Sequence, residues 1–420
     1  MKKYIEIYNY YKELILTDQI KCNDKMPSIR KASTLLGVSK TTVQNAYFEL
    51  QADGYIISSP KSGYFVSEIV PQQQTYNNVK KNKKDIKYDL KSGDADKESF
   101  DISLWQRYIK SALRQKERLL SYGDVQGEQD LREALCDYIR EKRNVSASAD
   151  RIVIGAGVQS LLNILCSLID ERKTVSFPDK SFNQGISLFS DYGFEVHTRD
   201  KDAKIIYVSP SHMTSFGNVM SIKRRLELIK YSEKTNSLII EDDFDADFVY
   251  QSKPTPSLFA LSGGKNVVYM GSFSNVLVPG IRISFMVLTK ELADKFEKKK
   301  SCFAQTASKT EQIALCGYIR DKHINSQTRR IRRLYTEKTK AFFLELKKQL
   351  PDAKLEIGEN TLQIKLSIPF DKDISIFEEN SLSVHISSYE NGVINLLLIP
   401  SAISKNDIPN AVKALKKALK

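Results

Sequence analysis

Residues 27–56 read PSIRKASTLLGVSKTTVQNAYFELQADGYI, and this stretch predicts two short helices joined by a tight turn. Ser28 is placed to cap the first helix, and Gly37 is suited to the left-handed position that ends it. Ser39 is placed to cap the second helix, and Gly54 to terminate it. Two short helices joined in this way make a helix-turn-helix, whose second helix enters the major groove of DNA.

The residue pattern gives the two helices one face for the protein core and one face for contact with DNA. Apolar residues at helical spacing are expected to supply the buried face: Leu35, Leu36, Val43, Ala46 and Leu50. Short polar and cationic residues remain on the outer, N-terminal part of the second helix, where they can reach phosphates and base edges: Lys40, Thr41, Thr42 and Asn45. A helical hairpin with one polar face is a weak signal alone, so the sequence that follows it matters.

Residues 55–58 and 63–66 are predicted to pair as a hairpin wing, with Lys61 lying along the DNA backbone. Residues 27–66 resemble the GntR-family winged helix over their whole length. The resemblance implies that DNA is contacted by the Pro-Ser-Ile-Arg segment, by the opening of the second helix and by the wing glycine: Ser28, Arg30, Ser39, Lys40, Thr41, Thr42 and Gly63. Lys40 stands where arginine is commoner in that family, which predicts a weaker bidentate contact.

The composition limits the class of protein. The 420 residues include 64 Lys and Arg against 51 Asp and Glu, and this formal charge of +13 favours an anionic partner, nucleic acid or membrane. Five scattered cysteines without a C-x-x-C pair, and four histidines with no i,i+4 pair, disfavour a disulfide scaffold and a Cys- or His-based metal site. The start, MKKYIEIYNYYKELI, is too charged for a signal peptide, so we expect a soluble cytoplasmic protein.

The pattern along the chain predicts three parts. Residues 1–68 form the helix-turn-helix with its wing, and residues 69–91, rich in Gln, Asn and Lys, form a basic flexible linker. Residues 92–420 alternate short apolar runs with helical patterns, which is typical of an α/β domain with a mostly parallel central sheet. Its end, residues 320–420, is predicted to be a smaller α+β subdomain that begins with a long basic helix. The basic stretches at 295–300 and 329–333 are solvated or interface faces, or a second DNA-contacting patch.

Several blocks of the second domain resemble the fold-type I aminotransferase-like domain of MocR (GabR-type) regulators. The blocks are SYGDVQG (121–127) with Leu131-Arg132, AGVQ (156–159), PSH (210–212), IEDDFDADFVY (240–250) and GSFSNVLVPGIR (271–282). The resemblance implies a head-to-tail homodimer that binds operator DNA. It also implies a pocket for pyridoxal phosphate, in which Asp242 pairs with the pyridine nitrogen and Ser272, Ser274 and Arg282 hold the phosphate.

Several positions depart from that family. Asn275 follows Ser274 where the family has the lysine that forms the Schiff base, and an amide nitrogen cannot form an imine. Phe244 stands where a tyrosine bonds the cofactor's phenolic oxygen, Val158 where a serine is usual, and Met213 where Gln follows Pro-Ser-His. No arginine follows Arg333, so the arginine that clamps a substrate carboxylate is absent.

These departures predict a vestigial pocket formed by Asp242, Phe244, Ser272, Ser274, Asn275 and Arg282, without catalytic residues or covalent cofactor. The favoured hypothesis is a DNA-binding regulator whose second domain dimerises. A second form of this hypothesis keeps the pocket as a non-covalent sensor of pyridoxal phosphate or another small anion. The alternative from a different functional class is an enzyme, a working aminotransferase. The acidic run at 241–247 lacks the central glycine of a calcium loop, which disfavours a metal site.

Overall fold

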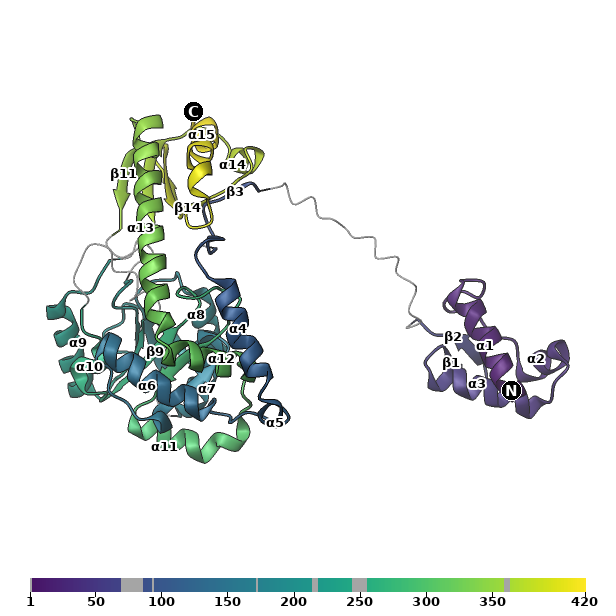
Figure 1. Cartoon of the computed structure of the whole chain (residues 1–420). Helices are drawn as coiled ribbons and strands as arrows, with labels where there is room; N and C mark the ends of the chain where they lie inside the picture. Colours follow the sequence, from purple (N-terminus) through teal and green to yellow (C-terminus); the bar gives the residue numbers. More distant parts are fainter. Residues whose placement is uncertain are drawn as a thin grey trace. The chain divides into compact units, whose positions relative to one another are not determined.

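The computed structural model describes residues 2–68, 86–92, 94–170, 173–213, 218–243, 255–358 and 363–420. The chain forms two compact units, Met1–Lys83 and Lys84–Lys420, which are described separately (Figure 1).

The first unit is a three-helix module with a two-stranded wing. Its elements are α1 (Lys3–Leu16), α2 (Ile29–Leu36), α3 (Lys40–Ala52), β1 (Ile56–Ser59) and β2 (Gly63–Val66), and the two strands pair antiparallel. Side chains of α1, α3 and the wing share one core, to which α1 contributes Ile7, Tyr11 and Ile15. The winged helix-turn-helix predicted from residues 27–66 is therefore confirmed.

The expected buried face of α2 was wrong at one position. Leu35 is 67% exposed, whereas Ala32 is fully buried. Ala32 and Leu36 lie four residues apart and so share the face that packs inward, while Leu35 is turned about 100° away from Leu36 on the helix.

The second unit is built on a seven-stranded sheet of order β4-β10-β9-β8-β7-β5-β6. Its strands are β4 (Ile152–Gly155), β5 (Thr174–Phe177), β6 (Glu195–Thr198), β7 (Ile205–Val208), β8 (Leu238–Asp242), β9 (Val267–Ser272) and β10 (Ser284–Val287). Among these strands, β10 pairs antiparallel with both β4 and β9, and the remaining pairs are parallel. The sheet is thus mostly parallel, as the alternating pattern predicts.

Helices cover both faces of this sheet (Figure 1). Side chains alternate along each strand, so that Ile239 joins one core while Leu238 and Ile240 join the other. The first core is shared with α4 (Ile102–Leu113), α6 (Gln129–Arg143), α9 (Ile222–Thr235), α10 (Leu258–Ser262) and α12 (Lys309–Arg320). The second is shared with α7 (Val158–Leu168), α8 (Asn183–Asp191) and α11 (Lys290–Lys299). Short helical turns lie at α5 (Lys116–Leu119), Ala149–Arg151 and Lys300–Cys302.

The C-terminal part forms a small α+β subdomain. Its antiparallel sheet has the order β11-β12-β15-β14, and the long helix α13 (His323–Gln349) runs into it from the sheet domain (Figure 1). The other elements are β11 (Lys354–Ile357), β12 (Ile364–Pro369), α14 (Ser375–Glu379), β13 (Leu382–Ser383), β14 (His385–Glu390), β15 (Val393–Leu398), the turn Lys405–Asp407 and α15 (Ile408–Leu419). These elements enclose a third apolar core.

The structure differs from the sequence interpretation at the end of the expected linker. Residues 69–85 lie outside the described part of the chain, but β3 (Tyr88–Asp89) pairs parallel with β13. Tyr88 and Leu90 are buried in the core of the small subdomain. The last residues of the segment predicted as linker over 69–91 therefore belong to the second unit.

Among the described residues, we find no helix that combines the length and apolar character needed to cross a lipid bilayer.

Candidate functional site: a DNA-reading face and a ligand cavity

The N-terminal end of α3 is held by its cap. Ser39 Oγ accepts a hydrogen bond from the Thr42 backbone N–H at 3.1 Å and lies 2.8 Å from Thr42 Oγ1. Ser28 caps α2 in the same way, because its Oγ accepts from the Lys31 N–H at 3.2 Å. The two caps fix the starts of both helices at the positions that the sequence predicts.

The predicted DNA-contacting residues are mostly on the surface. Arg30 on α2 and Lys40, Thr41 and Asn45 on α3 are exposed, while Thr42 is half-buried beside its cap. Exposed Gln44, between Thr41 and Asn45, was missed, although its position on the same polar face could have indicated it.

The wing presents its turn to solvent. Lys61 and Gly63 are exposed, and both have positive φ, 64° and 108°. A positive φ at Gly63 favours glycine, because a Cβ there would be strained.

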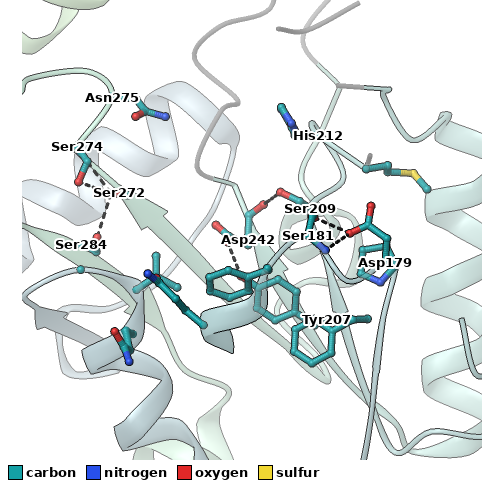
Figure 2. Close-up of a pocket in the computed structure, with 18 of the residues that line it drawn as sticks. Asp179, Ser181, Tyr207, Ser209, His212, Asp242, Ser272, Ser274, Asn275 and Ser284 are labelled. Atoms are coloured by element: carbon teal, nitrogen blue, oxygen red, sulfur yellow. Dashed lines mark hydrogen bonds between the residues drawn. The ribbon is translucent and has the colours of Figure 1, made fainter. Parts of the chain in front are cut away.

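A cavity of about 510 Å³ opens in the second unit (Figure 2). It is lined by residues at or just after the ends of β5, β7, β8 and β9, including Phe177, Tyr207, Asp242 and Ser272. In open α/β sheets, ligands bind outside the carboxyl ends of the parallel strands. The small subdomain contributes further lining from Gln363, His385, Leu397 and Ile399.

One side of the cavity is a cluster of serine hydroxyl groups (Figure 2). Arg282 lies beside this cluster. Ser272 Oγ lies 3.3 Å from Ser274 Oγ and 3.0 Å from Ser284 Oγ, and Arg282 Nη1 donates to Ser274 Oγ at 3.5 Å. The N-terminus of α7 lies on the same lining through Gly157, Val158 and Gln159. A helix N-terminus, hydroxyls and a guanidinium together favour an anion.

Gly157 lets the arginine approach the start of α7. Its φ is +91°, and a Cβ at this position would lie 2.6 Å from Arg282 Nη2. Any larger residue would therefore strain the backbone and displace the guanidinium.

Asp242 lies in the cavity and accepts a hydrogen bond from the Tyr207 hydroxyl. Burial, with the nearby Asp242 charge, raises the pKa of Tyr207 well above its usual value, so Tyr207 stays a donor. The Tyr207 ring stacks between Phe177 and Phe182, with ring centroids 5.0 and 5.4 Å away. Asp242 is thus held in one orientation by a protonated phenol.

The residues on either side of Asp242 have structural roles. Glu241 is fully buried, and its two carboxylate oxygens accept from the Leu258 and Phe259 N–H groups at 2.7 and 2.8 Å, capping α10. Burial raises the pKa of Glu241 to about 7. Asp243 forms a two-armed ion pair with Arg143, at 2.6 and 3.0 Å. Within the described residues, no group of three or more His, Cys, Asp or Glu side chains is arranged for a metal ion.

The predicted pocket residues are brought together where the structure describes them. Asp242, Ser272, Ser274, Asn275 and Arg282 all line the cavity, as do Val158 and Met213. Phe244 lies outside the described residues. Sequence reasoning missed Phe182, Tyr207, Gly157 and Ser284; Tyr207 lies just before the Pro-Ser-His block, which could have drawn attention to it.

Two sequence families match the two units. Residues 3–66 match the family described as bacterial regulatory proteins, gntR family, and residues 85–364 match the family described as aminotransferase class I and II.

Solved aminotransferases share the fold of the second unit. An archaeal alanine:glyoxylate aminotransferase superposes with a TM-score of 0.69 at 22% identity, covering 79% of this chain and 90% of that chain. The Pyrococcus horikoshii kynurenine aminotransferase superposes with a TM-score of 0.68 at 19% identity, covering 80% and 91%. At this identity, the likeness shows the fold alone.

Together, the DNA-reading module and the aminotransferase-type domain define a transcriptional regulator of the helix-turn-helix class. The chain is 32% identical to the HTH-type transcriptional regulator YdeL of Bacillus subtilis, covering 99% of this chain and 96% of that protein. It is 28% identical to the probable rhizopine catabolism regulatory protein MocR of Rhizobium meliloti, covering 87% and 81%. It is 26% identical to the pyridoxine biosynthesis regulator PdxR of Corynebacterium glutamicum, covering 74% and 72%. The chain belongs to the MocR-type GntR family, in which a winged helix is joined to a class I and II aminotransferase domain.

Proposed function

We propose that this DNA-binding regulator uses its second unit as a dimerising domain that binds a phosphate-bearing ligand without forming an imine. The observation that carries the proposal is the anion cradle of Ser272, Ser274, Arg282 and the α7 N-terminus beside an amide, Asn275. The winged helix binds operator DNA in the cytoplasm. The ligand regulates this binding because it binds more tightly to one of two conformations, of which only one is competent to bind DNA.

The cradle supports a phosphate but not a covalently held cofactor. Pyridoxal phosphate, which the fold family implies, needs an anion site, a carboxylate for its ring nitrogen and a lysine amine for its aldehyde. The hydroxyls, Arg282 and Asp242 fit the first two needs. Asn275 does not fit the third, because an amide nitrogen is not nucleophilic. We therefore propose that the domain is not an enzyme.

The test of this proposal is a trapping experiment. We expect the unaltered protein mixed with pyridoxal phosphate to give no borohydride-stable adduct in the cavity beyond the level of exposed lysines, because Asn275 cannot form the imine and Lys91, which lines the cavity, is itself an exposed lysine. Asn275→Lys is expected to give an adduct at position 275 but only partial affinity, since Val158 and Met213 stay unchanged. The measurements are absorbance spectra and peptide mass mapping before and after reduction.

Two results would contradict the proposal. An adduct that forms on Lys91 in preference to the surface lysines of the unaltered chain would show that imine chemistry persists in the cavity. Full cofactor affinity from Asn275→Lys alone would show that the other departures are neutral. Surface lysines supply the internal control, because their adducts form equally in both proteins.

The proposal of a homodimer is supported by an apolar segment of the second unit. Leu120 is 88% exposed and Tyr122 is fully exposed, just after α5. Two large apolar side chains so close in sequence are costly to leave in water and are typical of an interface. We propose that a second copy of the chain covers them.

Replacing Leu120 and Tyr122 together by Asp is expected to weaken the dimer about 10²–10⁴-fold, because burying each side chain contributes about 1.5–3 kcal/mol. Sedimentation over a concentration series measures the effect. Leu344→Asp is the matched control, since Leu344 is a 56% exposed leucine on α13. An unchanged dimer, or an equal loss with Leu344→Asp, would contradict this interface.

A further inference from the structure

We propose that Lys91 is a second anion-binding residue of the cavity, which selects ligands that join a phosphate to a carboxylate. This inference rests on the proposed phosphate cradle and adds the chemistry of the ligand's other end.

The charges of the lining point to two anionic groups. Among the described residues, Lys91 and Arg282 are the lysine and arginine side chains that line the cavity. Both are exposed, and neither forms an ion pair within the part of the chain that the structure describes. The two lining carboxylates already have donors: Asp242 accepts from Tyr207, and Asp179 from the Ser181 N–H at 2.8 Å.

The two cations come from different parts of the second unit. Arg282 precedes β10 of the large sheet, whereas Lys91 follows β3, which belongs to the small subdomain. His385, Leu397 and Ile399, on and just after strands of the small subdomain, line the cavity on the same side as that segment. A ligand held at the cradle can therefore reach Lys91 only by extending toward the small subdomain.

Hydrogen bonds fix the backbone at Lys91, so the lysine keeps its place at the edge of the cavity. The Leu90 N–H donates to Ser383 O at 2.8 Å, and Leu90 O accepts from the Ile399 N–H at 2.9 Å. Asp89 Oδ1 then accepts from the N–H groups of Lys91 and Ser92 at 2.8 and 3.0 Å, which forms a tight turn. The backbone that carries Lys91 is thus held by hydrogen bonds at the cavity, and its side chain is exposed.

These features define the ligand class. A cavity of about 510 Å³ accommodates a small metabolite, and Arg282 already supplies the positive charge of the phosphate cradle. Lys91 supplies a positive charge from another element.

Matched phosphonates test the proposal with the full-length protein. 3-Phosphonopropionate, 4-phosphonobutyrate and 5-phosphonopentanoate each have an alkylphosphonate counterpart in which a methyl group replaces the carboxylate. We expect at least one carboxylate of the series to bind about 5- to 30-fold more tightly than its counterpart by calorimetry, as a charge-assisted contact would provide. Lys91→Met is expected to abolish this difference, Lys91→Arg to keep it, and the alkylphosphonate affinity to stay constant.

Further variants distinguish the proposed phosphate cradle from the Lys91 inference. Arg282→Met is expected to weaken both kinds of phosphonate, because it removes the charge of the cradle. If neither kind binds the unaltered protein, the proposed function fails, and the Lys91 inference fails with it. If both bind equally, or if Lys91→Met keeps the carboxylate preference, the cradle stands and the Lys91 inference is overturned. Lys91 is exposed, so an unchanged thermal transition is expected for its variants.

Discussion

Replacing both Arg30 and Lys40 by Ala is expected to lower the affinity for operator DNA by about 10²–10⁴-fold, since each good contact to a base edge is worth about 1–3 kcal/mol. Both side chains are exposed on the two helices that the Ser28 and Ser39 caps fix in place. Neither side chain packs in the module core, so the fold is expected to persist. Because cations that neutralise phosphates release counterions, the slope of log affinity against log salt should also become shallower, by about one for each phosphate that is no longer neutralised.

The affinity is measured by fluorescence anisotropy at several salt concentrations. The probe is the DNA that footprinting of the intact protein identifies next to its own gene, with a shuffled duplex as reference. Lys3→Ala is the matched control, because it removes an exposed positive charge from α1, outside the helix-turn-helix. An equal loss of DNA affinity with Lys3→Ala would show that the effect comes from net charge and not from contacts of the helix-turn-helix. Unchanged DNA affinity of the double variant would show that Arg30 and Lys40 do not contact the operator.

The winged helix could be predicted because its signals are local. The Ser caps and the glycines lie within a few residues of the turns that they determine. Leu35 shows the limit of that reasoning, since hydrophobicity alone does not say which of two neighbouring leucines faces inward. The face is set by packing against α3, which local pattern does not specify.

Part of the cavity lining could be predicted from the order of the sequence blocks and not from local signals. The order of the sequence blocks located Asp242, Ser272, Ser274, Asn275 and Arg282 at one site. The separate roles of Glu241, Asp242 and Asp243 follow from strand alternation, which turns Asp242 to one face and its neighbours to the other. Lys91 could not be found, because its place depends on β3 pairing with β13, far away in the sequence.

Breaking the ion pair between Arg143 and Asp243 is expected to have the largest effect on stability. The side chains of Arg143 and Asp243 are 9% and 0% exposed, and Arg143 Nη1 also donates to Thr255 O at 3.1 Å. Removing one partner of a buried pair costs about 3–5 kcal/mol, because the remaining charge is left without its counter-charge. After Arg143→Met, Asp243 keeps the Tyr269 hydroxyl at 2.8 Å and the Ser211 hydroxyl at 3.2 Å, two neutral donors for a full negative charge.

Urea unfolding measures this loss, and Trp105 makes the measurement specific. It is the only tryptophan of the chain and is buried in the second unit, so its fluorescence follows that unit rather than the winged helix. Arg140→Met is the matched control, because Arg140 lies on the same helix and pairs with Asp137 at 65% and 76% exposure. A surface pair of this kind is worth about 0–1 kcal/mol. Equal losses for Arg143→Met and Arg140→Met would show that burial of the pair does not matter. If Arg143→Met with Asp243→Leu recovers part of the stability lost by Arg143→Met alone, the stranded Asp243 charge is the cause.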